Sequence, residues 1–140
     1  MLTHKTKVRV RFGDTDPYGV AYFVSYFKYF HKGVEEFLRY LDIPPETFFR
    51  NQQEKFGMPK VAADCSFSVP ARYGDLLEMH TSIKELKEKS IVFQFKFYRP
   101  PETRVMAEGS VTFVCIDHTW KARPLPEILV GKIQSHLPAK

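Results

Sequence analysis

The sequence predicts an α+β fold in which a curved antiparallel sheet of five strands wraps around one long central helix. Three observations carry this prediction: an alternating strand near the N-terminus, a long amphipathic helix after it, and four extended segments joined by short turns. The 140 residues, of which 44% are hydrophobic, suffice for one compact core. No internal repeat or Gly/Ser-rich linker interrupts the chain, so we expect a single domain over residues 1–140.

The first two elements follow from hydrophobic periodicity. Between residues 6 and 12 the apolar side chains of Val8, Val10 and Phe12 alternate with basic ones, which predicts a half-buried strand. From 23 to 41 the apolar residues recur at spacings of three and four, which predicts a helix of about five turns with one buried stripe. Gly33 interrupts this helix at a cost of roughly 1 kcal/mol relative to Ala, and we interpret it as a close approach of another backbone.

The second half of the chain is extended. Alternation and turn residues predict strands at about 61–69, 76–86, 90–98 and 104–116, preceded by a short helix over 46–53. A last helix over 126–136 starts with proline. Short turns favour antiparallel neighbours, and the amphipathic helix needs a sheet against which to bury its stripe. Five strands around one helix leave open edges, so pairing between subunits is a natural completion.

Composition and motifs argue against several classes of protein. The net charge of +5 permits an anionic partner, but the basic residues are dispersed and no nucleic-acid-binding motif is present. The polar N-terminus and the lack of roughly 18 continuous apolar residues predict a cytoplasmic protein without membrane insertion. The histidines lack metal-ligand spacing, so we expect no metal. Cys65 and Cys115 lie in apolar runs and are expected to be reduced, buried thiols.

The segment 13–19 is the candidate for chemistry. Asp16, followed by Pro17 and then Gly19, has the signature of a type I turn, and local pattern alone favours a turn role for the aspartate. The same segment leads into the long helix, whose first N–H groups and dipole favour an anion. A carboxylate beside such donors is what hydrolysis of an activated acyl group requires. Both roles are open at this point.

The residues RFGDTDPYGVAYFVSY, 11–26, resemble the N-terminal signature of the 4-hydroxybenzoyl-CoA thioesterase family, which includes the acyl-CoA thioesterases associated with the Tol-Pal system. The residues PARYGD, 70–75, resemble the family's turn between the second and third strands, and the likeness extends over about 5–116. This resemblance implies the hotdog fold. It also implies hydrolysis of a short-chain or aromatic acyl-CoA to the carboxylic acid and free CoA, with no cofactor beyond the coenzyme A of the substrate.

The resemblance assigns roles within the site. Asp16 corresponds to the catalytic aspartate, as general base toward water or as nucleophile, and this correspondence reverses the preference for a turn role. The oxyanion donor would be the backbone N–H of Phe23, where family members often carry Tyr or His. Substrate contacts are expected from Tyr22, Ser25 and Tyr26, with Ser25 standing where some relatives have Asn.

The hairpin 84–90 resembles a basic hairpin that contacts the nucleotide phosphates in the aryl-CoA enzyme. Lys87 and Lys89 match this pattern, whereas Glu88 replaces a basic residue, and a solvated hairpin tip is the alternative interpretation. We expect a homo-oligomer, a dimer unit with shared sites that assembles into a tetramer. The rival functions are an acyl-carrier-protein thioesterase of the same fold and a non-catalytic acyl-CoA-binding protein.

Overall fold

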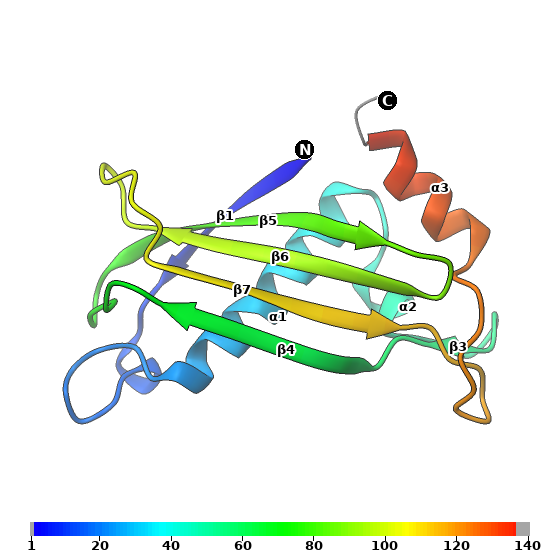
Figure 1. Cartoon of the computed structure of the whole chain (residues 1–140), viewed down its shortest axis with the longest axis horizontal. Helices are drawn as coiled ribbons and strands as arrows, with labels where there is room; N and C mark the ends of the chain where they lie inside the picture. The colour runs from blue at the N-terminus through cyan, green and yellow to red at the C-terminus, as the bar shows by residue number, and fades with distance from the viewer. Residues whose placement is uncertain (1, 137–140) are drawn as a thin grey trace.

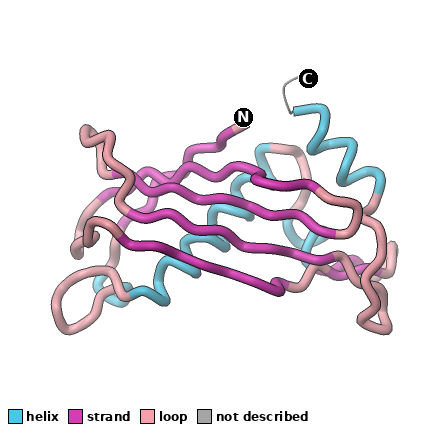
Figure 2. Tube along the Cα trace, viewed as in Figure 1, coloured by secondary structure: helices cyan, strands magenta, loops and turns pink. Residues whose placement is uncertain are grey.

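In the computed structural model, which describes residues 2–136, a five-stranded antiparallel sheet in the order β1-β5-β6-β7-β4 lies over helix α1 (Figures 1 and 2). The α+β content and the five-stranded antiparallel sheet are therefore confirmed. The elements are β1 Thr3–Arg9, η1 Phe12–Asp14, α1 Phe23–Tyr40, α2 Pro45–Phe49, β2 Arg50–Asn51, β3 Phe56–Gly57, β4 Lys60–Phe67, β5 Leu76–Leu86, β6 Ser90–Tyr98, β7 Ala107–Val114 and α3 Glu127–His136.

Several boundaries differ from the sequence prediction, two of them for identifiable reasons. The first strand ends at Arg9, and Phe12 is 77% exposed because the chain turns into the 3-10 helix η1 instead of continuing the alternation. The prediction that Phe12 shares the buried face of Val8 and Val10 is therefore wrong. The short helix α2 stops at Phe49, and the residues after it form the β2–β3 hairpin, which the sequence analysis did not predict.

The core lies between α1 and the inner face of the sheet. The stripe of α1 is buried against alternating residues of β6, and the ring of Phe30 stacks on that of Phe95 with centroids 4.4 Å apart. Gly33 marks a close approach, but of side chains and not of the predicted backbone, because a Cβ there would lie 2.7 Å from Oγ1 of Thr81 on β5. The periodicity of this helix thus fixes which side faces the sheet. Its first turn lies at the end of the sheet where β4 finishes (Figure 1).

Strand β4 is the exposed edge of the sheet. Its backbone pairs with β7 on one side, and of its eight residues only Cys65 is half-buried, the others being exposed. The exposed residues include Val61, at 59%, and Phe67, at 50%. An edge strand that presents apolar side chains and free backbone groups is a template for pairing with another strand. Within residues 2–136, no helix is long and apolar enough to cross a membrane.

Candidate active site

Asp16 lies in a tight turn just before α1. The amide of Gly19 donates to the carbonyl of Asp16 at 2.9 Å, and Gly19 has a φ of +78°, which confirms the predicted turn. The amide of Tyr18 donates to Oδ1 of Asp16 at 2.8 Å. The other carboxylate oxygen, Oδ2, forms no hydrogen bond or ion pair within residues 2–136. The turn therefore fixes the carboxylate through one oxygen and leaves the second available.

Asp14 fastens this loop to the helix. Its Oδ2 accepts hydrogen bonds from the hydroxyl of Tyr29 at 2.9 Å and from the amide of Arg11 at 3.0 Å. Its carbonyl accepts from the hydroxyl of Ser25 and from the amide of Tyr22, both at 2.8 Å. Burial, together with the hydrogen bond to Asp14, raises the pKa of Tyr29 and keeps it a donor. The two aspartates of the motif, both half-buried, thus differ, because Asp14 positions the loop while Asp16 keeps one carboxylate oxygen without a hydrogen bond in the described chain.

The first turn of α1 offers uncapped amide donors. Tyr22 occupies the N-cap position without a side-chain cap, and no acidic residue lies in the first turn. In the described part of the chain the amides of Phe23 and Val24 donate no hydrogen bond outside the helix, whereas that of Ser25 donates to the carbonyl of Tyr22. Free N–H groups at the positive end of a helix dipole are donors for an oxyanion. The first turn of α1 therefore offers amide donors at Phe23, the position predicted from the sequence.

The predicted substrate contacts have different environments. Tyr22 is exposed at the helix start, while the Ser25 hydroxyl is buried and already bonded to the loop. Tyr26 is 2% exposed and packs its ring against those of Phe67 and Phe97. Burial raises the pKa of Tyr26 to about 12. Of these three, Tyr22 alone presents its side chain to solvent in the single chain.

Exposed aromatic rings surround the Asp16 turn. They come from the loop itself, the first turn of α1, the end of β4 and the turn 70–75, and we call them the aromatic rim: Phe12, Tyr18, Tyr22, Phe23, Phe67 and Tyr73. Within this group the ring of Phe12 contacts that of Tyr73, and the ring of Tyr22 contacts that of Phe23. Exposed apolar surface gathered on a small protein marks a site for a ligand or a partner. The turn 70–75 packs on the Asp16 loop through the amides of Ala21 and Tyr73. Burial raises the pKa of Asp75 in this turn. The Arg72 amide and the Arg99 guanidinium outweigh this effect and hold that pKa below its usual value.

Lys87 and Lys89 lie at the other end of the sheet. Strand β5 begins at Leu76 beside the Asp16 loop and runs 11 residues before it reaches their hairpin (Figure 1). Both lysines are exposed, and Lys87 forms an ion pair with Glu85 at 3.4 Å. One chain therefore does not bring the predicted phosphate contacts and the predicted catalytic aspartate together.

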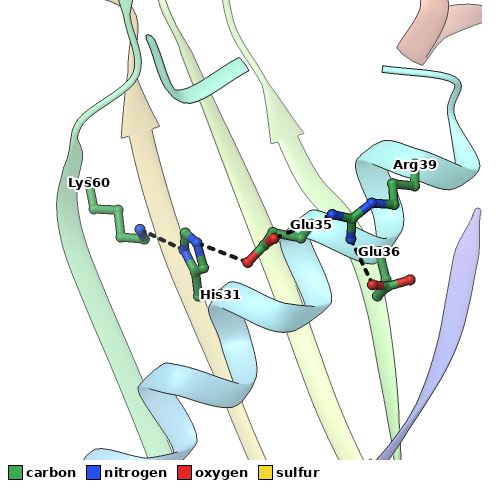
Figure 3. Close-up of polar contacts among 5 residues, drawn as sticks. All are labelled: His31, Glu35, Glu36, Arg39 and Lys60. Atoms are coloured by element: carbon green, nitrogen blue, oxygen red, sulfur yellow. Dashed lines mark hydrogen bonds and ion pairs between the residues drawn. The ribbon is translucent and has the colours of Figure 1, made fainter. Parts of the chain in front are cut away.

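A second polar cluster, on the outer side of α1, was not predicted (Figure 3). Lys60 Nζ lies 3.0 Å from His31 Nδ1, and His31 Nε2 lies 3.2 Å from Glu35 Oε1, so the imidazole bridges a cation and a carboxylate. Burial, and then the charge of Lys60, lowers the pKa of His31. The spacing of His31 and Glu35 by four residues was a signal in the sequence, but Lys60 comes from a distant strand. Among the described residues no group of His, Cys, Asp and Glu could hold a metal ion.

Residues 10–133 match the family model described as the thioesterase-like superfamily. The chain belongs to this superfamily. It is similar to the acyl-CoA thioesterase YbgC of Haemophilus influenzae, with 33% identity over 79% of this chain and 78% of the relative. A second relative is the 1,4-dihydroxy-2-naphthoyl-CoA hydrolase of Acaryochloris marina, with 33% identity over 89% of this chain and 91% of the relative.

Solved structures of thioesterases share the fold of this thioesterase-like chain. The gentisyl-coenzyme A thioesterase BH1999 superposes with a TM-score of 0.78 at 31% identity, covering 91% of this chain and 99% of the other. Slr0204 of Synechocystis, a 1,4-dihydroxy-2-naphthoyl-CoA thioesterase, gives a TM-score of 0.86 at 24% identity, covering 94% and 96%. The predicted hotdog fold is thereby confirmed, as is the resemblance of the chain to thioesterases at the level of the superfamily.

Proposed function

We propose that this protein hydrolyses acyl-CoA thioesters to the carboxylic acid and free coenzyme A. The observation that carries the proposal is the Asp16 carboxylate, held through one oxygen in a turn that leads directly to the uncapped N-terminus of α1. The relatives with 33% identity, named as an acyl-CoA thioesterase and a naphthoyl-CoA hydrolase, support the same chemistry.

In the proposed mechanism the amides at the start of α1 and the Asp16 carboxylate have separate roles. The thioester carbonyl oxygen accepts hydrogen bonds from the amides of Phe23 and Val24, which stabilise the negative charge that develops there. Asp16 either removes a proton from the attacking water or attacks the carbonyl carbon itself to form a mixed anhydride, which water then hydrolyses. In both routes the carbon–sulfur bond breaks, and the sulfur leaves as thiolate and takes up a proton.

We propose a short-chain or aromatic acyl group, as in the 4-hydroxybenzoyl-CoA thioesterase branch of the superfamily. The aromatic rim supports this choice, because flat apolar rings around the turn provide stacking surfaces for an aromatic acyl group. The aryl-CoA names of two of the relatives support it as well. Cys65 and Cys115 are free thiols, which supports a reducing, cytoplasmic setting.

We also propose a dimer unit with shared sites, which assembles into a tetramer. Strand β4 presents a free edge and exposed apolar residues, and its antiparallel pairing with β4 of a second copy would continue the sheet. Such pairing brings the Lys60 end of one β4 beside the Phe67 end of the other. It therefore joins one subunit's Asp16 turn to the end of its partner that carries Lys87 and Lys89, which supports the expected sharing of the site.

The test is release of free thiol from a panel of short acyl-, long acyl- and benzoyl-CoA thioesters by wild type and Asp16→Asn. General base or nucleophilic catalysis contributes on the order of 100-fold or more, so we expect a loss of at least that size. Asp42→Asn is the matched control, because Asp42 is an exposed aspartate in a turn after α1 and should leave the rate unchanged. Equal rates for Asp16→Asn and wild type would remove Asp16 from the mechanism.

The same assay separates the two rival functions. An acyl-carrier-protein thioesterase would cleave carrier-bound acyl groups without competition from free coenzyme A, because no nucleotide site is involved. A non-catalytic acyl-CoA-binding protein would bind the thioester and release no thiol above the uncatalysed rate.

A further inference from the structure

The polar cluster on α1 contains a lysine without an acidic partner. Nζ of Lys60 lies 3.0 Å from Nδ1 of His31, and within residues 2–136 this lysine forms no ion pair with a carboxylate. The carboxylate of Glu35 lies beyond the imidazole, where it is 3.2 Å from Nε2 of His31 and 3.7 Å from the guanidinium of Arg39 (Figure 3). The charge of Lys60 is therefore available to an anion from outside the chain.

Two aromatic rings hold the Lys60 side chain in place. Nζ lies 5.4 Å from the ring centroid of Phe49 and 5.3 Å from that of Phe113, both within reach of a cation–π contact. The ring of His31 also stacks on that of Phe49, with centroids 4.8 Å apart. Phe113 is fully buried and pairs with Lys60 across β4 and β7, so the lysine lies on the face of the sheet toward α1.

The hydrogen bond between Lys60 and His31 leaves donors free on the lysine. An ammonium only donates, so Nδ1 of the neutral imidazole is the acceptor, and the ring proton lies on Nε2, toward Glu35. Within residues 2–136 this is the one hydrogen bond that Nζ forms, although an ammonium can form more. The remaining donors suit a carboxylate, whose oxygens only accept.

The surroundings of Lys60 and His31 favour the neutral form of each as long as no anion is bound. Burial lowers the pKa of Lys60, and the charge of Glu35 offsets part of this effect. The pKa of His31 is lowered as well, by burial and by the charge of Lys60. An opposite charge nearby favours the charged form of a titratable group, so a carboxylate beside Nζ would raise both pKa values. An anionic ligand therefore stabilises the charged lysine.

Lys60 lies at the start of β4, the strand through which we propose that two subunits pair. Phe67 ends this strand, and the centroid of its ring lies 5.1 Å from that of Tyr26 in the first turns of α1. Antiparallel pairing of two copies of β4 sets Lys60 of one subunit beside Phe67 of the partner subunit. A two-fold axis perpendicular to the sheet keeps both α1 helices on one face, which is also the face of Lys60. The lysine therefore faces the start of α1 in the partner, where the Asp16 turn lies.

We infer that Lys60 binds a carboxylate at the far end of an acyl group whose thioester lies at Asp16 of the partner subunit. This inference rests on the proposed thioesterase function and its shared dimer site. It narrows the substrate class to acyl-CoA thioesters whose acyl group carries a second carboxyl group. Because the rings of Phe49 and Phe113 cover part of the ammonium, its attraction to a carboxylate is stronger than in open solvent.

The test compares acyl-CoA thioesters in pairs, one with a terminal carboxylate and one without. The pairs are malonyl- and propionyl-CoA, succinyl- and butyryl-CoA, glutaryl- and pentanoyl-CoA, and 4-carboxybenzoyl- and 4-methylbenzoyl-CoA. Wild type should prefer the carboxylate in at least one pair, and there Lys60→Met should lower the ratio of the two kcat/KM values about tenfold or more, because a hydrogen bond to a charged group is lost. The loss should appear in KM and not in kcat, since the bond forms in ground and transition states alike. No preference of wild type for the carboxylate in any pair would overturn the inference.

Lys96→Met is the matched control for this comparison. Lys96 lies in β6 between the buried Phe95 and Phe97, so its side chain is on the face of the sheet opposite α1. The ratio of the two kcat/KM values in this variant should equal that of wild type. An unaltered ratio in Lys60→Met would overturn the inference. An equal loss for both members of a pair would overturn it as well, because the lysine would then affect a step that both thioesters share.

A binding measurement tests the same contact without turnover. Stable S-alkyl thioethers of coenzyme A, with and without a terminal carboxylate, are titrated into the protein by calorimetry. Wild type should bind the carboxylate-bearing thioether more tightly than the neutral one, and Lys60→Met should bind both alike. Equal affinities of wild type for the two thioethers would contradict the inference. Failure of the proposed function is a different result, namely no hydrolysis of any thioester by wild type, and the calorimetric comparison still decides whether Lys60 binds the carboxylate.

Discussion

Gly109→Ala should destabilise the protein, because the structure leaves no room for a methyl group at this position. Gly109 lies in β7 between Phe95 of β6 and Cys65 of β4. An added Cβ would overlap the backbone carbonyl of Asp64 and lie 2.5 Å from Cζ of Phe30, whose ring is held by stacking on Phe95. Neither obstacle is the end of a flexible side chain, so the strand or the ring must move.

The magnitude follows from two opposing effects. Overpacking of this kind costs about 1–3 kcal/mol, whereas replacing glycine by alanine restricts the unfolded chain and returns about 0.4–1 kcal/mol. A backbone obstacle favours the upper part of the range, so we expect a net loss of about 2 kcal/mol. For a chain of this size each kcal/mol corresponds to about 3–4 °C, which gives a fall in Tm of about 6–8 °C.

The assay is thermal and urea unfolding followed by circular dichroism, with Gly131→Ala as the control. An added Cβ at Gly131 in α3 meets nothing within 4 Å, so this variant should gain up to about 1 kcal/mol from helix propensity. A Tm of Gly109→Ala equal to or above that of wild type would refute the packing argument. If both variants lost stability equally, the cause would be a general effect of the substitution.

Three further predictions concern other contacts. Thr81→Val should raise the free energy of unfolding by about 1 kcal/mol in urea, since the buried hydroxyl of Thr81 has no hydrogen-bond partner in the described chain; a loss of stability would contradict this. Tyr29→Phe should lower the free energy of unfolding by about 1–2 kcal/mol in the same measurement and slow thiol release, because it removes the hydrogen bond to Asp14 that fastens the Asp16 loop; an unchanged rate would show that this hydrogen bond does not contribute to catalysis. Lys60→Met should raise the pKa of His31 in an NMR titration, because a nearby positive charge is lost. The pKa of His31 is lowered from 6.5 in the folded chain, so its neutral form is preferred there and its contribution to stability is full above pH 6.5. The contribution of His31 to the free energy of unfolding decreases as the pH drops below 6.5 and stops decreasing below the lowered pKa. Lys60→Met should make this decrease smaller.

Much of the fold could be predicted from hydrophobic periodicity, because burying one face of a helix or strand requires apolar residues at regular spacings in the sequence. The stripe of α1 and the alternation of β6 identified the two surfaces of the core, and Gly33 marked a contact that the structure contains. The prediction failed at Phe12, where the chain leaves the sheet by a 3-10 turn. Nothing in the alternation of three residues reveals whether the next hydrogen bond will be made to a neighbouring strand or within a turn.

The candidate site could be predicted only in part. The motif around Asp16 placed a carboxylate beside a helix start, which the structure contains, but the different contacts of Asp14 and Asp16 depend on Tyr29, two turns into the helix. The cavity between the β2–β3 hairpin and the turn after β7 was not predicted, since it joins a hairpin at 50–57 to a turn at 116–120 and has no local signature. The pair of His31 and Lys60 was missed for the same reason, because pairing across distant segments leaves no spacing pattern.

The placement of the Asp16 turn and the β5–β6 hairpin, which carries Lys87 and Lys89, at opposite ends of one sheet has a genetic consequence (Figure 1). In a dimer of the proposed kind each site combines one end from each subunit. A hybrid of a chain with a defective Asp16 and a chain with a defective Lys87–Lys89 hairpin would therefore collect both defects in one site and leave the other site intact. Two inactivating alleles of this gene should complement each other when they are expressed together, and each hybrid should recover half the activity of the normal dimer.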